Sequence, residues 1–146
     1  MSLAIVYTRA ALGIEAPLIT VEVHLSNGLP GLTMVGLPET TVKEARDRVR
    51  SALINSGYAF PAKKITINLA PADLPKEGGR YDLPIALALL VASEQLNTTR
   101  LNQYEFVGEL ALTGGLRGVP GAIPSAVEAI KAGRRIVVSS DNAAEV

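Results

Sequence analysis

Only a few side chains in this sequence could carry out covalent chemistry. The 146 residues include no cysteine and one histidine, His24. Without a thiol there is no cysteine nucleophile, no disulfide and no thiolate zinc site, and one imidazole is too few for a histidine-based metal centre. His24 stands in the alternating stretch Val21 to Leu25, where we expect a surface residue of a strand. The sequence therefore predicts neither a metal site nor serine–histidine catalysis.

The remaining catalytic options are a serine–lysine pair and a pair of carboxylates. A desolvated lysine loses its proton readily and can activate a hydroxyl, but the residue pattern alone does not show where such a pair would lie. Asp73 with Glu77, and Glu105 with Glu109, stand at short spacings. In loops and on strands such carboxylates are ordinarily solvated, so no acid–base dyad is predicted.

The glycines give one signal for anion binding. A nucleotide-phosphate loop needs a lysine directly after a glycine, and none of the 13 glycines is followed by one. The turn Gly78-Gly79-Arg80 precedes an expected helix and could hold an anion by its free N–H groups, or it is a plain structural turn. The sequence leaves both interpretations open.

The charges balance over the whole chain but gather locally. Fourteen Lys and Arg residues against fourteen Asp and Glu residues give no net charge, which excludes a histone-like or arginine-rich nucleic-acid binder. A local basic cluster is still expected, because Lys43, Arg46 and Arg50 share the outer face of a predicted helix. Lys63 and Lys64 follow that helix.

Hydrophobic patterning predicts a mixture of strands and helices that must position these side chains. The expected strands are Leu3 to Tyr7, Leu18 to Leu25, Leu32 to Val35, Ile65 to Leu69, Glu105 to Leu110 and Arg135 to Ser139. The expected helices run from Thr41 to Gly57, from Leu83 to Leu96 and from Pro124 to Ala132, and another begins after Asp141.

Short motifs suggest where these helices begin and end. Thr41 with Glu44 indicates a capping box, Gly57 a C-terminal cap and Asp82 an N-terminal cap. The helix from Leu83 is apolar nearly all round, which predicts the central helix of the domain. Its apolar run is about half the roughly 20 residues that cross a bilayer. The N-terminus lacks the features of a signal peptide, so we expect a cytoplasmic protein.

Three long stretches carry a family resemblance: VEVHLSNGLPGLTMVGLPETTVKEARDRVRSAL, ITINLAPADLPKEGGRYDLPIALALL and VGELALTGGLRGVPGAIPSA. They resemble the N-terminal domain of ComM/YifB-type proteins, the Mg-chelatase-like AAA+ ATPases, over essentially all of residues 1 to 146. The resemblance implies one α+β domain of the ribosomal protein S5 domain 2 type, Lon-protease-like, with a mixed sheet packed with helices. It also implies that an ATPase module follows, which agrees with a chain that stops inside a helical stretch.

The resemblance to Lon-type proteases can be followed residue by residue. Their nucleophilic serine is the sixth residue of a Pro-Lys-Asp-Gly-Pro-Ser stretch, and the matching stretch here, Pro75 onward, has Arg80 at that position. In the later stretch that supplies the lysine, Pro124 stands at its position. Arginine is no acyl-accepting nucleophile and proline has no side-chain base. The resemblance therefore implies a domain without catalytic residues, although Lys76 and Ser125 lie nearby as substitutes.

The resemblance also implies a function for the intact protein. It would be a homo-hexameric motor that uses ATP and Mg to drive branch migration of DNA in natural transformation and recombination, with its own ATPase module as the partner of this domain. This domain itself would hold no cofactor. Its candidate DNA contacts are Lys43, Arg46, Arg50, Lys63, Lys64 and Arg80, and the alternative is that these charges are merely solvated.

Two other functions stay open. One is an ATP-dependent protease-like enzyme with a relocated pair, Ser125 with Lys131. The other is an ATPase that supports metal insertion into a porphyrin, as the name of the family suggests.

Overall fold

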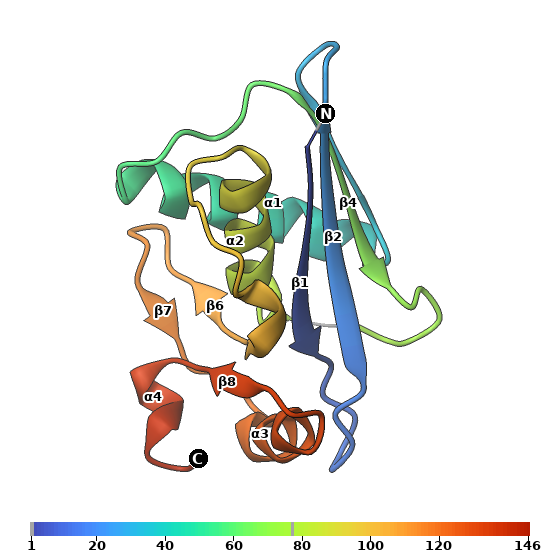
Figure 1. Ribbon diagram of the computed structural model, residues 1–146, viewed down its shortest axis with the longest axis vertical. Coiled ribbons are helices and arrows are strands. Elements are labelled where there is room, and N and C mark those ends of the chain that lie inside the picture. The colour runs from blue at the N-terminus through green and yellow to red at the C-terminus, as the bar shows by residue number, and fades with distance from the viewer. Residues whose placement is uncertain (1, 77) are drawn as a thin grey trace.

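A six-stranded mixed sheet is the frame of the computed structural model, which describes residues 2–76 and 78–146 (Figure 1). The strands are β1 (Ser2–Arg9), β2 (Leu18–Ser26), β3 (Gly31–Val35), β4 (Lys64–Ala70), β5 (Tyr104–Phe106), β6 (Glu109–Leu110), β7 (Leu116–Arg117) and β8 (Arg135–Val137). The helices are α1 (Glu39–Asn55), α2 (Asp82–Ala92), α3 (Ala122–Lys131), α4 (Ser140–Ala143) and the 3-10 turn η1 (Leu101–Gln103).

The large sheet has the strand order β3-β4-β2-β1-β5-β8. Strand β2 pairs antiparallel with β1 and β4, whereas β1 with β5, β3 with β4 and β5 with β8 are parallel. Strands β6 and β7 form a separate antiparallel pair. Parallel and antiparallel pairs thus occur in one sheet, and the α+β fold that the sequence predicts is confirmed.

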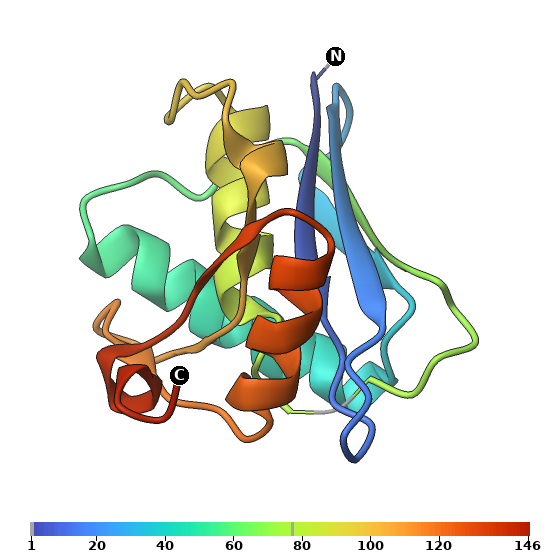
Figure 2. The ribbon, with the colours of Figure 1, turned by 60° about the horizontal axis from the view of Figure 1, so that its bottom comes forward.

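The core lies between this sheet and two helices. The inward residues of β2, including Val21 and Val23, are fully buried and alternate with partly exposed ones, as its sequence pattern predicts. Helix α2 packs on β1 and β2, and α1 packs beside α2. Figure 2 shows both helices on the same side of these strands. The opposite face carries the exposed side chains of Leu3 and Ile5.

The predicted N-terminal caps were wrong in two cases. Helix α1 begins at Glu39, because the carbonyl of Pro38 already accepts from the Val42 N–H, and no side chain caps it. The capping box that Thr41 indicated does not form. Asp82 does not cap α2 either, since its carboxylate points to partners in other elements.

Two segments end earlier than predicted. Helix α2 ends at Ala92. Glu94 then has a positive φ of 62°, and the Gln95 N–H donates to the Leu90 carbonyl. The predicted strand from Glu105 to Leu110 is divided into β5 and β6, because the Gly108 N–H bonds to the Arg80 carbonyl. The division places the two halves in different sheets.

Candidate functional site

Arg80 connects three parts of the chain from a buried position. Its Nε donates to the Arg9 carbonyl at 3.0 Å, its Nη1 to the Pro120 carbonyl at 2.6 Å and its Nη2 to the Ser125 Oγ at 3.0 Å. The residue is 5% exposed, and burial lowers the pKa of its guanidinium below its ordinary value. The structure does not favour the predicted nucleic-acid contact of Arg80, because its donors bind protein acceptors inside the fold.

Arg80 and Pro124, which the resemblance to Lon-type proteases matches to the catalytic positions, lie close together here. Arg80 reaches Ser125 at the start of α3, and Pro124 is the preceding residue. Ser125 is fully buried, and its hydroxyl accepts from a guanidinium, which is no base. The arrangement joins two elements and holds no serine–lysine pair.

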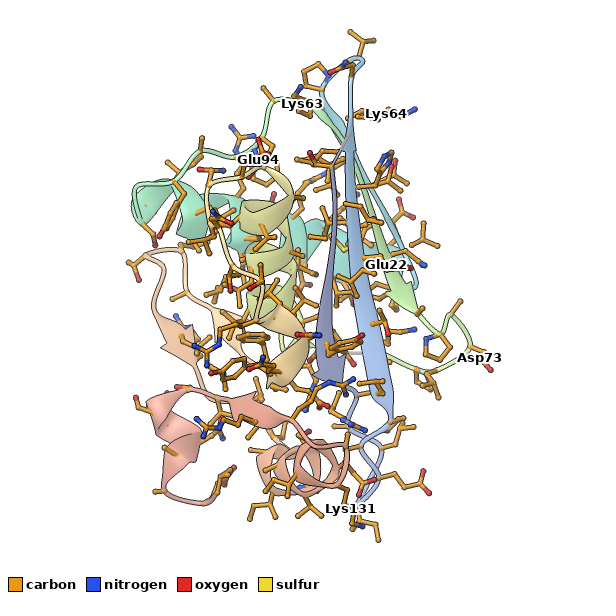
Figure 3. The ribbon with its side chains drawn as sticks, in the orientation of Figure 1. Glu22, Lys63, Lys64, Asp73, Glu94 and Lys131 are labelled. Atoms are coloured by element: carbon orange, nitrogen blue, oxygen red, sulfur yellow. The ribbon has the colours of Figure 1, made fainter. Side chains whose placement is uncertain are left out.

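The two lysines considered for a substitute pair have other partners. Lys131 has a side chain that is 71% exposed and pairs with Glu128 at 3.2 Å, and Figure 3 places it at the outer end of α3. The predicted pairing of Lys131 with the buried Ser125 does not form. Lys76 is buried, and its ammonium donates to the carbonyls of Pro71 and Leu74 within its own loop. Burial lowers the pKa of Lys76.

The glycine turn before α2 borders a cavity of about 590 Å³. The carboxylate of Glu109 lies so close to Gly79 that a Cβ at this glycine would collide with it. Gly79 also accepts from the Asp82 N–H at 3.0 Å. A carboxylate against the turn disfavours an anion there, and we therefore favour the plain structural turn. Glu77 lies outside the described residues.

Asp82 forms a buried ion pair that the sequence did not reveal. Arg48 donates to its carboxylate through Nε at 2.6 Å and Nη2 at 3.3 Å, and the Leu110 N–H donates at 3.1 Å. Burial raises the pKa of Asp82 to about 6, against the lowering effect of Arg48 and Leu110. The pair joins α1 to α2 and β6.

A second buried ion cluster surrounds Glu105, which the sequence predicted to be solvated. Glu105 is fully buried and accepts from Arg9 at 2.7 and 2.9 Å and from Arg134 at 3.1 Å. The prediction was wrong because β5 lies inside the sheet, between β1 and β8. Arg134 also stacks on the ring of Tyr7, with 4.0 Å between the guanidinium carbon and the ring centroid.

Three of the predicted basic residues line one groove of about 530 Å³, which we call the basic groove: Arg46, Arg50 and Lys63. Phe60 lies in the same groove. The distance from the guanidinium carbon of Arg50 to the centroid of the Phe60 ring is 5.6 Å. Lys63 donates to the Asn27 side chain at 3.1 Å. The helix α1 and the segment after it thus bring charges from two parts of the sequence together.

Two other predicted cations lie outside the lining of this groove. Lys43 is exposed on α1, one turn before Arg46. Lys64 begins β4 next to the buried Ile65, so that its side chain points to the opposite face of the sheet. Figure 3 shows Lys63 and Lys64 on different sides of the strands.

The described residues include no cluster of three or more His, Asp and Glu side chains that could hold a metal ion. Within the same residues, no helix has the length and apolar character needed to cross a membrane.

Comparison with known proteins identifies the family. The family model described as subunit ChlI of Mg-chelatase matches residues 21–142. The chain belongs to the ChlI family. Among relatives in this Mg-chelatase-like family, the chain is 82% identical to YifB of Salmonella typhimurium and 80% identical to YifB of Escherichia coli, over all 146 residues. It is 65% identical to the competence protein ComM of Haemophilus influenzae over 145 residues.

These identities confirm the ComM/YifB type that the sequence motifs suggested. The chain covers 28 to 29% of the length of these three relatives.

Proposed function

We propose that this ChlI-family chain is a non-catalytic domain of an ATP-driven motor that acts on DNA. In this proposal another module of a longer polypeptide binds ATP and Mg, six copies form a ring, and the motor promotes branch migration during natural transformation and recombination in the cytoplasm. The observation that carries the role of this domain is the basic groove, since it gathers exposed cations. Arg80, which the resemblance places at the Lon nucleophile position, is buried.

The geometry of the groove suits a phosphate backbone. Arg46 and Arg50 are four residues apart on α1, which corresponds to about 6 Å along the helix axis, and Lys63 approaches from the other wall. The pair between Arg46 and Asp47 is exposed and 3.6 Å long, and such a pair contributes little and yields easily to another anion. Phe60 supplies an aromatic ring on which a base can stack.

The relatives support the same role. One of them is named a competence protein. Competence supplies the DNA on which a recombination motor would act. Lys43 is one turn from the groove on the same helix face, and we propose it as an outer contact. We assign Lys64 no phosphate contact in the groove, because it points to the other face of the sheet.

The salt dependence of DNA binding by the full-length protein tests this proposal. Log affinity falls linearly with log salt concentration, and the slope is about 0.9 per phosphate neutralised on duplex DNA. The variant Arg46→Gln with Lys63→Gln should reduce the slope by about 2 for each domain in contact. Lys131→Gln is the matched control, since it removes an exposed charge at the opposite end of the molecule and should leave the slope unchanged.

A full-length protein whose salt slope is the same in all three forms would remove the basic groove from the DNA interface. Binding that does not depend on salt would remove the DNA role itself.

The match to subunit ChlI of Mg-chelatase favours a second candidate function, ATP-driven insertion of magnesium into a porphyrin. An insertion assay with the full-length protein, ATP, magnesium and a porphyrin decides between the two. Metallated porphyrin formed only with ATP would favour the chelatase, whereas DNA remodelling without insertion would favour the motor.

A further inference from the structure

Helix α3 buries its small residues and exposes its large apolar ones. Its buried side chains are small and belong to Ala122, Ser125, Ala126 and Ala129. Its large apolar side chains, Ile123, Val127 and Ile130, are exposed, and Ile130 is 69% exposed. Because these three recur at spacings of four and three residues, they form one continuous stripe along the helix.

A hairpin beside α3 carries another exposed apolar side chain. Ile14 is 91% exposed at the tip of the turn between β1 and β2. The turn packs beside α3, because Arg9 donates to the Glu128 carbonyl and a Cβ on Gly121 would lie 3.2 Å from the Ala11 Cβ. Figures 1 and 2 show the turn next to α3 from two directions. We call this surface the α3 face: Ile14, Ile123, Val127 and Ile130.

We propose that the ATPase module of the same polypeptide docks on the α3 face. This proposal rests on the proposed function, which includes such a module. Four exposed side chains supply only a fraction of the roughly 800 Å² per partner that a stable complex of free proteins buries. A tethered partner needs less, because a short linker gives an effective concentration in the millimolar range.

Two observations favour a tethered module over a second copy. The relatives contain more chain than this domain, since it covers 28 to 29% of their length. The C-terminal end of the domain lies at the same end of the molecule as α3 in both views (Figures 1 and 2). A module attached there reaches the α3 face through a short connection. The charges beside the stripe on α3, Glu128 and Lys131, pair with each other, so the stripe itself is apolar.

Cysteine labelling in the full-length protein tests the docking. The sequence of this domain has no cysteine, so that Ile130→Cys adds a single thiol on the α3 face. Leu3→Cys is the matched control, because Leu3 is 63% exposed on the open face of the sheet. A charged alkylating reagent is applied, and mass spectrometry of the two peptides gives the labelling rate at each position. Docking predicts a rate at least about tenfold lower at position 130 than at position 3, in the full-length protein at any dilution.

Each other outcome overturns the proposal. Equal labelling rates would show that the α3 face is open. Slow labelling at position 130 that becomes fast on dilution would assign the face to a second copy. A Val127→Cys variant repeats the measurement within the stripe, and both positions must agree. The result does not depend on DNA, so a failure here and a failure of the DNA proposal are separate findings.

Discussion

Replacing Asp82 by Asn should change how the stability of the protein depends on pH. In the folded protein, burial raises the pKa of Asp82 to about 6, whereas the ordinary value is 3.8. The folded state therefore binds this proton more tightly than the unfolded state does. The carboxylate of Asp82 consequently lowers the stability above pH 6, and this penalty is relieved as the pH falls from 6 towards 4.

The size of the effect follows from the shift in pKa. A difference of about two pKa units corresponds to about 3 kcal/mol between the fully ionised and the fully protonated limits. Between pH 7 and pH 5, Asp82 changes from mostly ionised to mostly protonated in the folded protein, which raises the free energy of unfolding by about 1 kcal/mol. Asp82→Asn has no such proton to bind.

Urea unfolding at pH 7 and pH 5 measures this difference. Far-ultraviolet circular dichroism is the suitable signal, because the sequence contains no tryptophan. From pH 7 to pH 5 the wild type should become more stable relative to Asp82→Asn by about 1 kcal/mol. Asp47→Asn is the control, since Asp47 lies on α1 with its side chain 73% exposed, and it should follow the wild type. An identical pH response of wild type and Asp82→Asn would refute the reasoning.

Three further substitutions test individual contacts by urea unfolding. Glu94→Gly should stabilise by about 1 kcal/mol, because Glu94 holds a φ of 62° that favours glycine; an equal gain from Glu94→Ala would point to the charge instead. Glu105→Gln should destabilise by about 3 to 5 kcal/mol, since it leaves the buried Arg9 without its carboxylate, and an unchanged midpoint would contradict this. Gly36→Ala should destabilise by more than about 1 kcal/mol, because its φ is 95° and a Cβ would collide with the Leu69 carbonyl; wild-type stability would refute the collision.

Local sequence patterns predicted the elements of the fold well. The alternation in β2 places Val21 and Val23 in the core, and the apolar run from Leu83 forms the central helix. Local cap motifs failed at two positions. Thr41 lies inside a helix that has already begun at Glu39, and the Asp82 carboxylate binds Arg48 of another helix. Element type thus followed from periodicity, whereas element ends depended on tertiary contacts.

The candidate site could be predicted only in part. Arg46 and Arg50 share a helix face, which the sequence shows, but Lys63 joins them only through the course of the chain after α1. The ion pairs could not be foreseen, because Arg48 lies 34 residues from Asp82 and Arg9 lies 96 residues from Glu105. No periodicity within one segment reports such contacts.

The hydrogen bonds of Arg80 connect the end of β1 with α3, the helix that carries the α3 face. Under the resemblance to Lon-type proteases, Arg80 stands at the position of the serine. The long side chain of Arg80 reaches both the Arg9 carbonyl at the end of β1 and the Ser125 hydroxyl on the inward side of α3. A serine side chain is too short to make both contacts. Ser125 lies on the same buried side of α3 as the other small residues, whereas Ile130 and its neighbours lie on the exposed side. Arg80, which the resemblance places at the nucleophile position, is thus bonded to the inward side of the helix that we propose as the docking surface.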